Sequence, residues 1–584
     1  MEVLMKTLLS IRKVLINGLM IASTSLAVSY TATAHAEGFF SKLFGSSSDS
    51  ASFESMLSHV PADTAYMMAN KKPIPKEVMD FHMKRAKDTF AMISKMQYQA
   101  KKQTKDSDEG ENKGQAFFKA LTEEFANKIA DGKYEDTGFS PKATSLIYGY
   151  KDMPVMRISI SDKEKIMEML KRAEEDSGYK LDLTKCGKFD CFKASGKKDA
   201  PQMAAVLLEN QLAMSLFSKE KSVELLDHLI GKSDPKESYS EKKWDTFLES
   251  NNYTGYGDGY INLKKLYNDN KELISEGFFA VNERSKSKVS DEEIQACTGV
   301  IDDHIKNMPE IIFGTKSLDV KKMDYEFVFK TSSGVSEVLQ GIANTTNIAK
   351  RSEDPIFDLG VNVNFQKFGA ALTTYSAFLV DSAEANKCTL INAKDVRKSM
   401  GGMMLVMNMG LSQFKSIYLS LNELEMDERM QPKKIDAILS IGSDSVDGLL
   451  GMATMMSPVL ANLKIPKDGT PVKLPAGAIP SKGMPLPPLS ISRSDTAINI
   501  MIGNDKPALK DYKSDKAEIM SFAMDGKRYY KILTNVMKTL PKAKDAQDEG
   551  VIDMMESMGS LMGKIQEEIH ADKRGLVIDY HLQY

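Results

Sequence analysis

The four cysteines are the residues of this sequence whose chemistry is easiest to define. Cys186 and Cys191 lie five positions apart in KCGKFDC, whereas Cys297 and Cys388 lie 91 positions apart. A thioredoxin-like redox centre would need two residues between its cysteines, and a zinc site would need close ligand pairs. Neither pattern is present. An even number of cysteines in an exported chain predicts structural disulfides, here Cys186–Cys191 and Cys297–Cys388.

The stretch YKLDLTKCGKFDCFKAS is typical of two short strands around Gly187-Lys188. With a four-residue loop, Cys186 and Cys191 are expected opposite each other across the hairpin, at a Cα separation of about 4.5–5.5 Å that suits a disulfide. The bridge between Cys297 and Cys388 closes a much longer loop, so we expect it to tie the two halves of the chain together and to stabilise more.

Motifs with known catalytic mechanics are missing. The sequence has no H-E-x-x-H, G-x-x-x-x-G-K-[ST], G-x-S-x-G or C-x-x-C, and no two histidines lie at metal-binding spacing. Ser218 and Lys221 match S-x-x-K, but the companion elements are absent and Ser218 suits a helix cap. We therefore predict no catalytic, cofactor-binding or metal-ligating residues and no cofactor, which makes an enzyme the less expected class.

Methionine is unusually frequent, with 37 residues in the chain. Several methionines fall at helical spacing and form flexible thioether stripes. The stripes comprise Met400, Met403, Met404 and Met407, and Met554, Met555 and Met558. Such stripes pack in a core or form an adaptable surface for a hydrophobic partner, and the sequence leaves both interpretations open.

The N-terminus has the layout of a cleavable secretory signal. Lys6, Arg12 and Lys13 precede an uncharged, mostly apolar run, and Ala34-His35-Ala36 supplies small residues before Glu37. Cleavage between Ala36 and Glu37 would leave a periplasmic or secreted protein with no later transmembrane segment, whereas a retained membrane anchor is the alternative. The formal net charge of −3 gives no electrostatic reason to expect nucleic-acid binding.

The remaining pattern mixes strands and helices and predicts an α+β fold with mainly antiparallel sheets. Residues 1–36 are the expected signal, 37–54 a leader, and 286–335 a connecting helix and strands. The first α+β half covers 55–285 and the second 336–584, because strand 154–160 matches 434–440 and hairpin 203–217 matches 488–502 in order. A helix is expected from Lys76 to Ala100, and SDKE at 161–164 predicts another that starts with a capping box.

The chain also resembles a group of uncharacterised exported bacterial proteins. VPADTAYMMAN matches their Pro-Ala-Asp-Thr strand opening, and VMRISISDKEKIMEML and AVLLENQLAMSLF match the units that follow. The resemblance implies an exported, duplicated α+β protein and supplies no functional residues. Together these features predict an envelope protein that acts by binding, as a scaffold or chaperone-like protein, with a protein or lipid partner. A hydrolase of cell-envelope material is the alternative.

Overall fold

The computed structural model describes residues 52–82, 85, 113–139, 143–151, 153–194, 202–217, 222–269, 291–344, 348–349, 352, 354–389, 391–408, 413–427, 432–456, 458–475, 488–503, 511–512, 516–539, 552, 555–559 and 562–584. The signal and leader, with Ala36 and Glu37, lie outside these residues. The chain forms two compact units. Unit 1 contains the described residues up to 260 together with 314–320, and unit 2 contains 261–313 and 321–584.

Unit 1 is built on an antiparallel sheet. Its strand order is β4 (Asp182–Cys186), β5 (Phe189–Ala194), β6 (Gln202–Leu207), β7 (Gln211–Phe217), β3 (Met153–Ser159), β2 (Ser145–Tyr150) and β1 (Tyr66–Asn70), with β8 (Asp258–Asn262) beside β1. The expected hairpin at 203–217 is present as β6 and β7.

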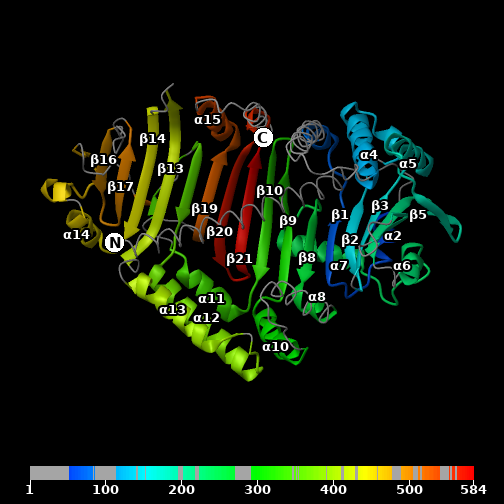
Figure 1. Ribbon diagram of the computed structural model, residues 1–584, viewed down its shortest axis with the longest axis horizontal. Coiled ribbons are helices and arrows are strands. Elements are labelled where there is room, and N and C mark those ends of the chain that lie inside the picture. Colours follow the sequence, from blue (N-terminus) through cyan, green and yellow to red (C-terminus); the bar gives the residue numbers. More distant parts are fainter. Residues whose placement is uncertain are drawn as a thin grey trace, which may run out of the picture. The chain divides into compact units, whose positions relative to one another are not determined.

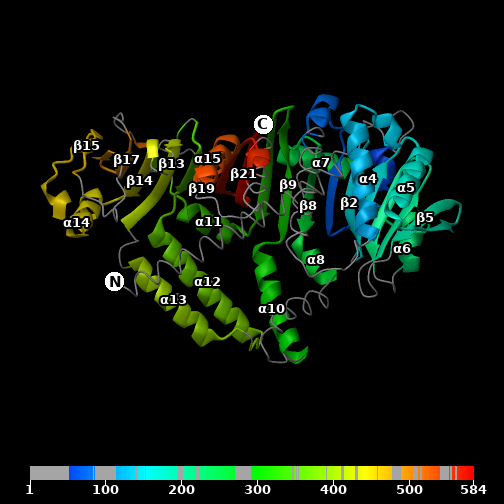
Figure 2. The same ribbon diagram turned by 45° about the horizontal axis from the view of Figure 1, so that its top comes forward.

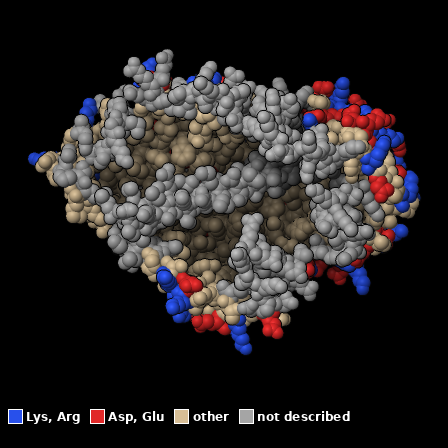
Figure 3. All heavy atoms as spheres, viewed as in Figure 1, with Lys and Arg blue, Asp and Glu red and all other residues tan. Residues whose placement is uncertain are grey.

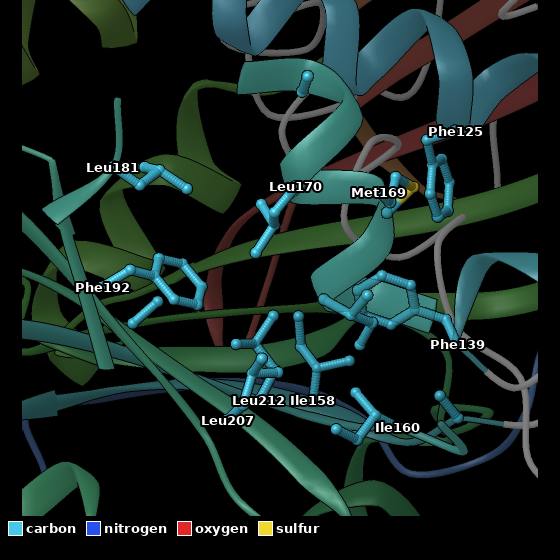
Figure 4. Packing of buried hydrophobic residues seen from close by; sticks show 14 of the residues in the cluster. Phe125, Phe139, Ile158, Ile160, Met169, Leu170, Leu181, Phe192, Leu207 and Leu212 are labelled. Carbon is cyan, nitrogen blue, oxygen red and sulfur yellow. The ribbon is translucent and has the colours of Figure 1, made fainter. Parts of the chain in front are cut away.

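The helices of unit 1 pack on both sides of this sheet. They are α2 (Phe53–Leu57), α4 (Lys113–Ala130), η1 (Tyr134–Thr137), α5 (Lys163–Ser177), α6 (Ser222–Leu229) and α7 (Glu241–Asn251). α4 and α5 lie on the side of Ile158, and α6 lies on the side of Arg157. Figure 4 shows Met169 and Leu170 of α5 above Ile158 and Leu212 of the sheet, with Phe125 of α4 alongside. Of the helix expected from Lys76 to Ala100, residues 76–82 and 85 are helical and the others lie outside the described residues.

The start of α5 differs from the prediction. Asp162, and not Ser161, is the N-cap, because its Oδ1 accepts hydrogen bonds from the backbone N–H groups of Glu164 and Lys165 at 3.0 and 3.2 Å. The hydroxyl of Ser161 instead donates to the carbonyl of Gly138 at 3.1 Å. The capping-box pattern therefore located the helix correctly but placed its cap one residue too early.

Unit 2 contains a longer antiparallel sheet (Figure 1). Its order is β15 (Val472–Lys473), β16 (Leu489–Arg493), β17 (Ala497–Ile502), β14 (Pro432–Ser443), β13 (Phe414–Met426), β12 (Phe357–Val361), β19 (Ala517–Asp525), β20 (Lys564–Asp572), β21 (Gly575–Gln583), β10 (Lys322–Lys330) and β9 (Glu310–Leu318), of which 314–318 belong to unit 1. A small pair, β11 (Ile348–Ala349) and β18 (Asp511–Tyr512), packs against β13 and β14 through β11.

Unit 2 also contains helices. They are α8 (Leu263–Asp269), α10 (Asp291–Asn307), α11 (Ser333–Ile342), α12 (Phe365–Ala385), α13 (Ala393–Asn408), α14 (Val446–Met456), η5 (Pro458–Asn462) and α15 (Gly526–Thr539), of which α12 is the longest. Figure 2 shows α12 and α13 side by side, and α10 also packs against α12. The α+β class is confirmed. Among the helices of the described residues, none combines the length and the apolar content needed to cross a membrane.

Both predicted disulfides are present, but the first has a different geometry. The turn between β4 and β5 contains only Gly187 and Lys188, Cys186 is paired with Phe189, and Cys191 lies opposite Thr184. The bridge therefore runs diagonally across the hairpin at a Cα separation of 5.7 Å, and the expected four-residue loop was wrong. Gly187 has a φ of +64°, which allows this tight turn.

The second bridge lies inside unit 2. Cys297 belongs to α10 and Cys388 follows α12, with a Cα separation of 4.6 Å. Both cysteines are buried and pack with Val300 and Ala383. The bridge ties α10 to the α12–α13 pair. It lies within unit 2 and does not join unit 1 to unit 2, so the expectation that it ties the two halves together was wrong.

Because the loops differ in length, the two bridges should stabilise the protein unequally. Replacing both cysteines of the 91-residue pair (C297S with C388S) should lower the free energy of unfolding by about 4 kcal/mol. The matched change C186S with C191S should lower it by about 2 kcal/mol, since its loop spans five residues. Urea titrations followed by far-UV circular dichroism measure both values. Equal losses, or a larger loss at the short loop, would contradict this expectation.

Candidate apolar binding face

Side-chain alternation gives the sheet of unit 2 two faces of opposite chemistry. Successive residues of a strand point to opposite faces, and residues paired across strands share a face. The strand register therefore continues from β16 to β10 as rows of side chains. On one side, here called the apolar face, the central row is Ile491, Ile500, Leu439, Leu419, Leu359, Phe522, Glu567, Tyr580 and Tyr325.

The rows on either side of the central row are also apolar. One is Leu489, Ile502, Ala437, Leu421, Phe357, Met524, Ile565, Leu582 and Met323. The other is Arg493, Ile498, Ile441, Ile417, Val361, Met520, Ile569, Ile578 and Phe327. The apolar face thus extends over the width of these strands with two ionisable acid or base side chains, Arg493 and Glu567.

The opposite side, here called the polar face, carries hydrogen-bonding and charged residues. The row directly beside the central apolar row is Ser492, Asn499, Ser440, Tyr418, Gly360, Ser521, Glu568, Asp579 and Glu326. Gly360 lets its neighbours approach closely, because a Cβ there would lie 2.5 Å from the hydroxyl of Ser521.

On β13, in the middle of the sheet, the burial of the two faces is the reverse of the usual pattern. On β13 the polar-face residues Ser416, Tyr418 and Ser420 are buried, whereas the apolar-face residues Ile417 and Leu419 are 37% and 40% exposed. Sheets normally bury their apolar face and leave the polar face in water. Leaving this much of a leucine or isoleucine in water costs about 1 kcal/mol for each side chain.

Described parts of the chain cover the polar face. The backbone N–H of Ser352 donates to the hydroxyl of Tyr418 at 2.8 Å, and the amide of Asn344 donates to the carbonyl of Lys415 at 3.1 Å. β11 packs on the same two strands, β13 and β14. These contacts cover Tyr418 and the part of the polar face beside it.

The apolar face is covered only in part by the described helices. At one end α14 packs on it through Val446 and Leu449, which contact Ile491 and Ile498. α15 lies at the upper end of β19 and β20 in Figure 1. Figure 3 shows a hollow over the strands of unit 2 whose visible described atoms are uncharged, with acidic and basic atoms elsewhere on the surface. The middle of the face remains accessible at Leu419.

The two ionisable side chains of the apolar face have different surroundings. Arg493 lies at its edge and is paired, since its Nε donates to the carbonyl of Ile465 at 2.9 Å and its guanidinium bonds Asp447 at 2.5 Å. Glu567 lies in the central row, is half-buried, and has no hydrogen-bond or ion-pair partner among the described residues. Burial raises the pKa of the Glu567 carboxyl above its usual value.

The charged groups of the polar face are paired with one another. Arg574 donates to both carboxylate oxygens of Glu326 at 3.1 and 2.9 Å. Lys516 lies between Glu568 and Asp579, at 3.3 and 3.1 Å. The described His, Cys, Asp and Glu side chains form no group suited to holding a metal ion. This pairing fits a structural role better than a catalytic one.

A small charged hollow of about 170 Å³ lies at the start of α14. It is lined by Asp444, Ser445, Val446, Asp447, Lys467, Arg493, Ser494 and Asp495. Lys467 and Arg493 both bond Asp447, at 3.2 and 2.5 Å, so the basic groups are already neutralised inside the hollow. This neutralisation leaves no net attraction for an anion.

Unit 1 contains a buried polar network around Arg157. Arg157, Tyr148 and His228 are each 0% exposed. The guanidinium donates to the hydroxyl of Tyr148 at 3.2 Å, to the side-chain oxygen of Gln211 at 3.2 Å and to the carbonyl of His228 at 2.9 Å.

The same network fixes the proton of His228. Nδ1 lies 3.2 Å from the carbonyl of Ser233 and must carry the hydrogen, so Nε2 accepts from the hydroxyl of Tyr148 at 2.7 Å. Burial, aided by the nearby charge of Arg157, lowers the pKa of His228 to about 4. The side chains of Arg157, Tyr148 and His228 all have hydrogen-bond partners. This indicates a structural network and not a substrate-binding site.

The GYGDG stretch at 255–259 is also structural. The carboxylate of Asp258 accepts from the backbone N–H groups of Gly255 and Thr315 at 2.6 and 2.7 Å. Burial raises the pKa of Asp258 to about 7, although these donors oppose the shift. The aspartate holds the loop before β8 against residues 314–315, where a Cβ on Gly314 would lie 2.5 Å from its oxygen.

The predicted methionine stripes are only partly described. On α13, Met400 and Met404 are half-buried, and the sulfur of Met404 accepts a hydrogen bond from Thr373 of α12 at 3.6 Å. Met555 and Met558 are also half-buried. The side chains of Met403, Met407 and Met554 lie outside the described part of the chain. A role of these stripes as a partner surface stays a prediction.

The apolar face was not found by sequence reasoning, although its signal is present. Strict alternation such as I-Y-L-S-L in β13 and I-N-I-M-I in β17 indicates strands with two unlike faces. The register that joins these strands into one face connects residues far apart in sequence, and it came only from the structure.

Comparison with known proteins adds no further assignment, since no protein-family model, curated protein or solved structure matches the chain.

The low pKa of His228 predicts how the stability of unit 1 depends on pH. Its folded value, about 4, lies below the unfolded value of 6.5, so the stability it contributes is present above pH 6.5 and is lost as the pH falls toward 4. At pH 7.5 we expect the His228→Gln variant to have a lower free energy of unfolding than the wild type. The difference between the two proteins should be about 3 kcal/mol smaller at pH 4.

Fluorescence of Trp244, the single tryptophan and a buried residue of unit 1, reports this transition in urea. Asp258 shifts in the opposite sense, but it is present in both proteins and cancels in the difference. A gap that is constant between the two pH values would show that His228 titrates normally.

Proposed function

We propose that this protein is an exported envelope protein that binds the hydrocarbon part of an amphipathic ligand, such as a lipid, on the apolar face of unit 2. The supporting observation is the inverted burial of the sheet: the polar face is covered and the apolar face is open around Ile417 and Leu419. A bound ligand best explains why apolar side chains are exposed on a sheet whose serines are fully buried.

The shape of the face favours a ligand chain over a flat partner. The hollow visible in Figure 3 and the packing of α14 at one end of the sheet give a concave surface. The central row from Ile500 to Phe522 presents aliphatic and aromatic side chains without a charge. Such a row supplies dispersion contacts along the length of a hydrocarbon chain.

Export supports the same proposal. Two disulfides, with no free cysteine among the described residues, suit an oxidising compartment outside the cytoplasm. The signal-like N-terminus is the other support for a periplasmic or secreted location. Hydrolysis of envelope material, the competing activity, gains no support, because the carboxylates gathered on the polar face are paired with Arg574 and Lys516.

We also propose that the chain consists of two tandem, related α+β halves. In unit 1 the hairpin β2–β3 pairs through β3 with β7 of the hairpin β6–β7, and α5 follows β3. In unit 2 the hairpin β13–β14 pairs through β14 with β17 of the hairpin β16–β17, and α14 follows β14. β1 and β12 lie beside β2 and β13 in the same way. This shared order supports a common plan.

Binding is tested with N-phenyl-1-naphthylamine, an uncharged dye that fluoresces in apolar surroundings. The wild type should bind the dye with saturation. The double variant Ile417→Gln with Leu419→Gln should bind it about ten- to thirtyfold more weakly, since each change removes about 1 kcal/mol of apolar contact. Thermal unfolding should change little, because both side chains are already partly exposed.

Matched controls come from exposed apolar residues elsewhere. Val223 on α6 is 73% exposed and Met455 on α14 is 78% exposed. Val223→Gln and Met455→Gln should leave dye affinity unchanged. If the controls weaken binding as much as the double variant does, or if the wild type binds no dye, the apolar face is not the binding site.

A further inference from the structure

Glu567 occupies an unusual position for a carboxylate. Its partners in the central row are Phe522 on β19 and Tyr580 on β21. Ile565 and Ile569, two residues away on the same strand, share its face. All four neighbours are apolar or aromatic, so the carboxylate is surrounded by groups that do not stabilise a negative charge.

The adjacent residue shows what a structural carboxylate looks like in this sheet. Glu568 points to the polar face, where Lys516 lies 3.3 Å away and the amide of Gln566 donates to it at 2.9 Å. Glu567 has no such partner among the described residues. A half-buried carboxylate without a partner is unfavourable for the isolated protein and is a feature of ligand-binding positions.

Aromatic side chains gather beside Glu567 on the same face. Tyr580 and Tyr325 continue the central row, and Phe327 lies within 5.9 Å of Tyr580 and 5.0 Å of Tyr325 between ring centroids. Ring faces attract an ammonium group, and a carboxylate pairs with it directly. The same surroundings repel a second carboxylate. A carboxylate flanked on the neighbouring strands by Phe522 and Tyr580 is therefore complementary to a cation.

The apolar row on the other side of Glu567 gives the length of the site. From β20 it passes over β19, β12, β13 and β14 to Ile500 on β17. Five strand-to-strand steps correspond to about 24 Å. This distance accommodates a long alkyl chain that starts at Glu567 and runs past Phe522 and Leu419.

We propose that the ligand of the apolar face is a long-chain amine, whose ammonium group pairs with Glu567 beside Tyr580 and Phe522 and whose alkyl chain lies along the central row. This inference rests on the proposed function and names its ligand class. The unpaired carboxylate of Glu567 then selects the polar end of the ligand, while the apolar rows select its chain.

Three ligands with the same chain test the proposal: dodecylamine, dodecanol and dodecanoate. Each is titrated into the protein loaded with N-phenyl-1-naphthylamine, below its micelle concentration. Dodecylamine should displace the dye at about tenfold lower concentration than dodecanol, and dodecanoate should be the weakest. Glu567→Gln should remove the preference for the amine, leave dodecanol within about twofold, and improve dodecanoate.

Two further measurements separate recognition from folding. Glu567→Gln should raise the midpoint of thermal unfolding or leave it unchanged, because it removes an unpaired charge from apolar surroundings, whereas a structural carboxylate would lower it. Glu425→Gln, at an exposed carboxylate of β13, is the matched control and should keep the amine preference.

The outcomes distinguish the two proposals. If none of the three ligands displaces the dye and the dye itself does not bind, the proposed function fails. If the three ligands bind alike and Glu567→Gln changes none of them, binding on the apolar face stands but the ammonium site is wrong. A preference for dodecanoate would also overturn the ammonium site.

Discussion

The structure of unit 2 depends on one constraint, the strict register of its antiparallel strands. Because paired residues share a face, a continuous register from β16 to β10 turns short alternating segments into whole rows of like side chains. A slip of one residue in a single strand would place serines among the isoleucines. The serine, asparagine and glutamate row is covered by residues such as Ser352 and Asn344, and this leaves the aliphatic rows as the more open side.

Pairing distinguishes several structural polar groups from Glu567, the candidate binding group. In unit 1, Arg157, Tyr148 and His228 form a closed chain of hydrogen bonds that ends at the carbonyl of Ser233. Asp258 is held by backbone donors, and Glu326 by Arg574. Unlike these paired groups, Glu567 has no hydrogen-bond or ion-pair partner among the described residues, and its neighbours on the adjoining strands are Phe522 and Tyr580.

Much of the local structure could be predicted from the sequence, because local patterns have local causes. Cysteine number and spacing predicted both disulfides, and an apolar run interrupted at Glu209-Asn210 predicted the hairpin of β6 and β7. The errors were small shifts, such as the cap at Asp162 and the diagonal bridge at Cys191, where alternatives one or two residues away have similar energies. The apolar face was missed for a different reason. Phe522, Leu359 and Leu419 come from three separated segments, and no local pattern states which strands become neighbours.

The alternation within each strand has a consequence for the export that we propose for this chain. Most isoleucines and leucines of the apolar rows are followed by a polar residue or glycine on the other side of the sheet, such as Ser440 after Leu439 and Asn499 after Ile498. Apolar residues are therefore distributed over short runs, such as Ile500-Met501-Ile502. A translocation channel handles the polypeptide in extended form, before it folds. None of these strands is long and apolar enough to stop in the channel and insert into the bilayer as a membrane span. A wide apolar surface can in this way form after translocation, when the strands pair, although each strand by itself is too short and too polar to insert into a membrane.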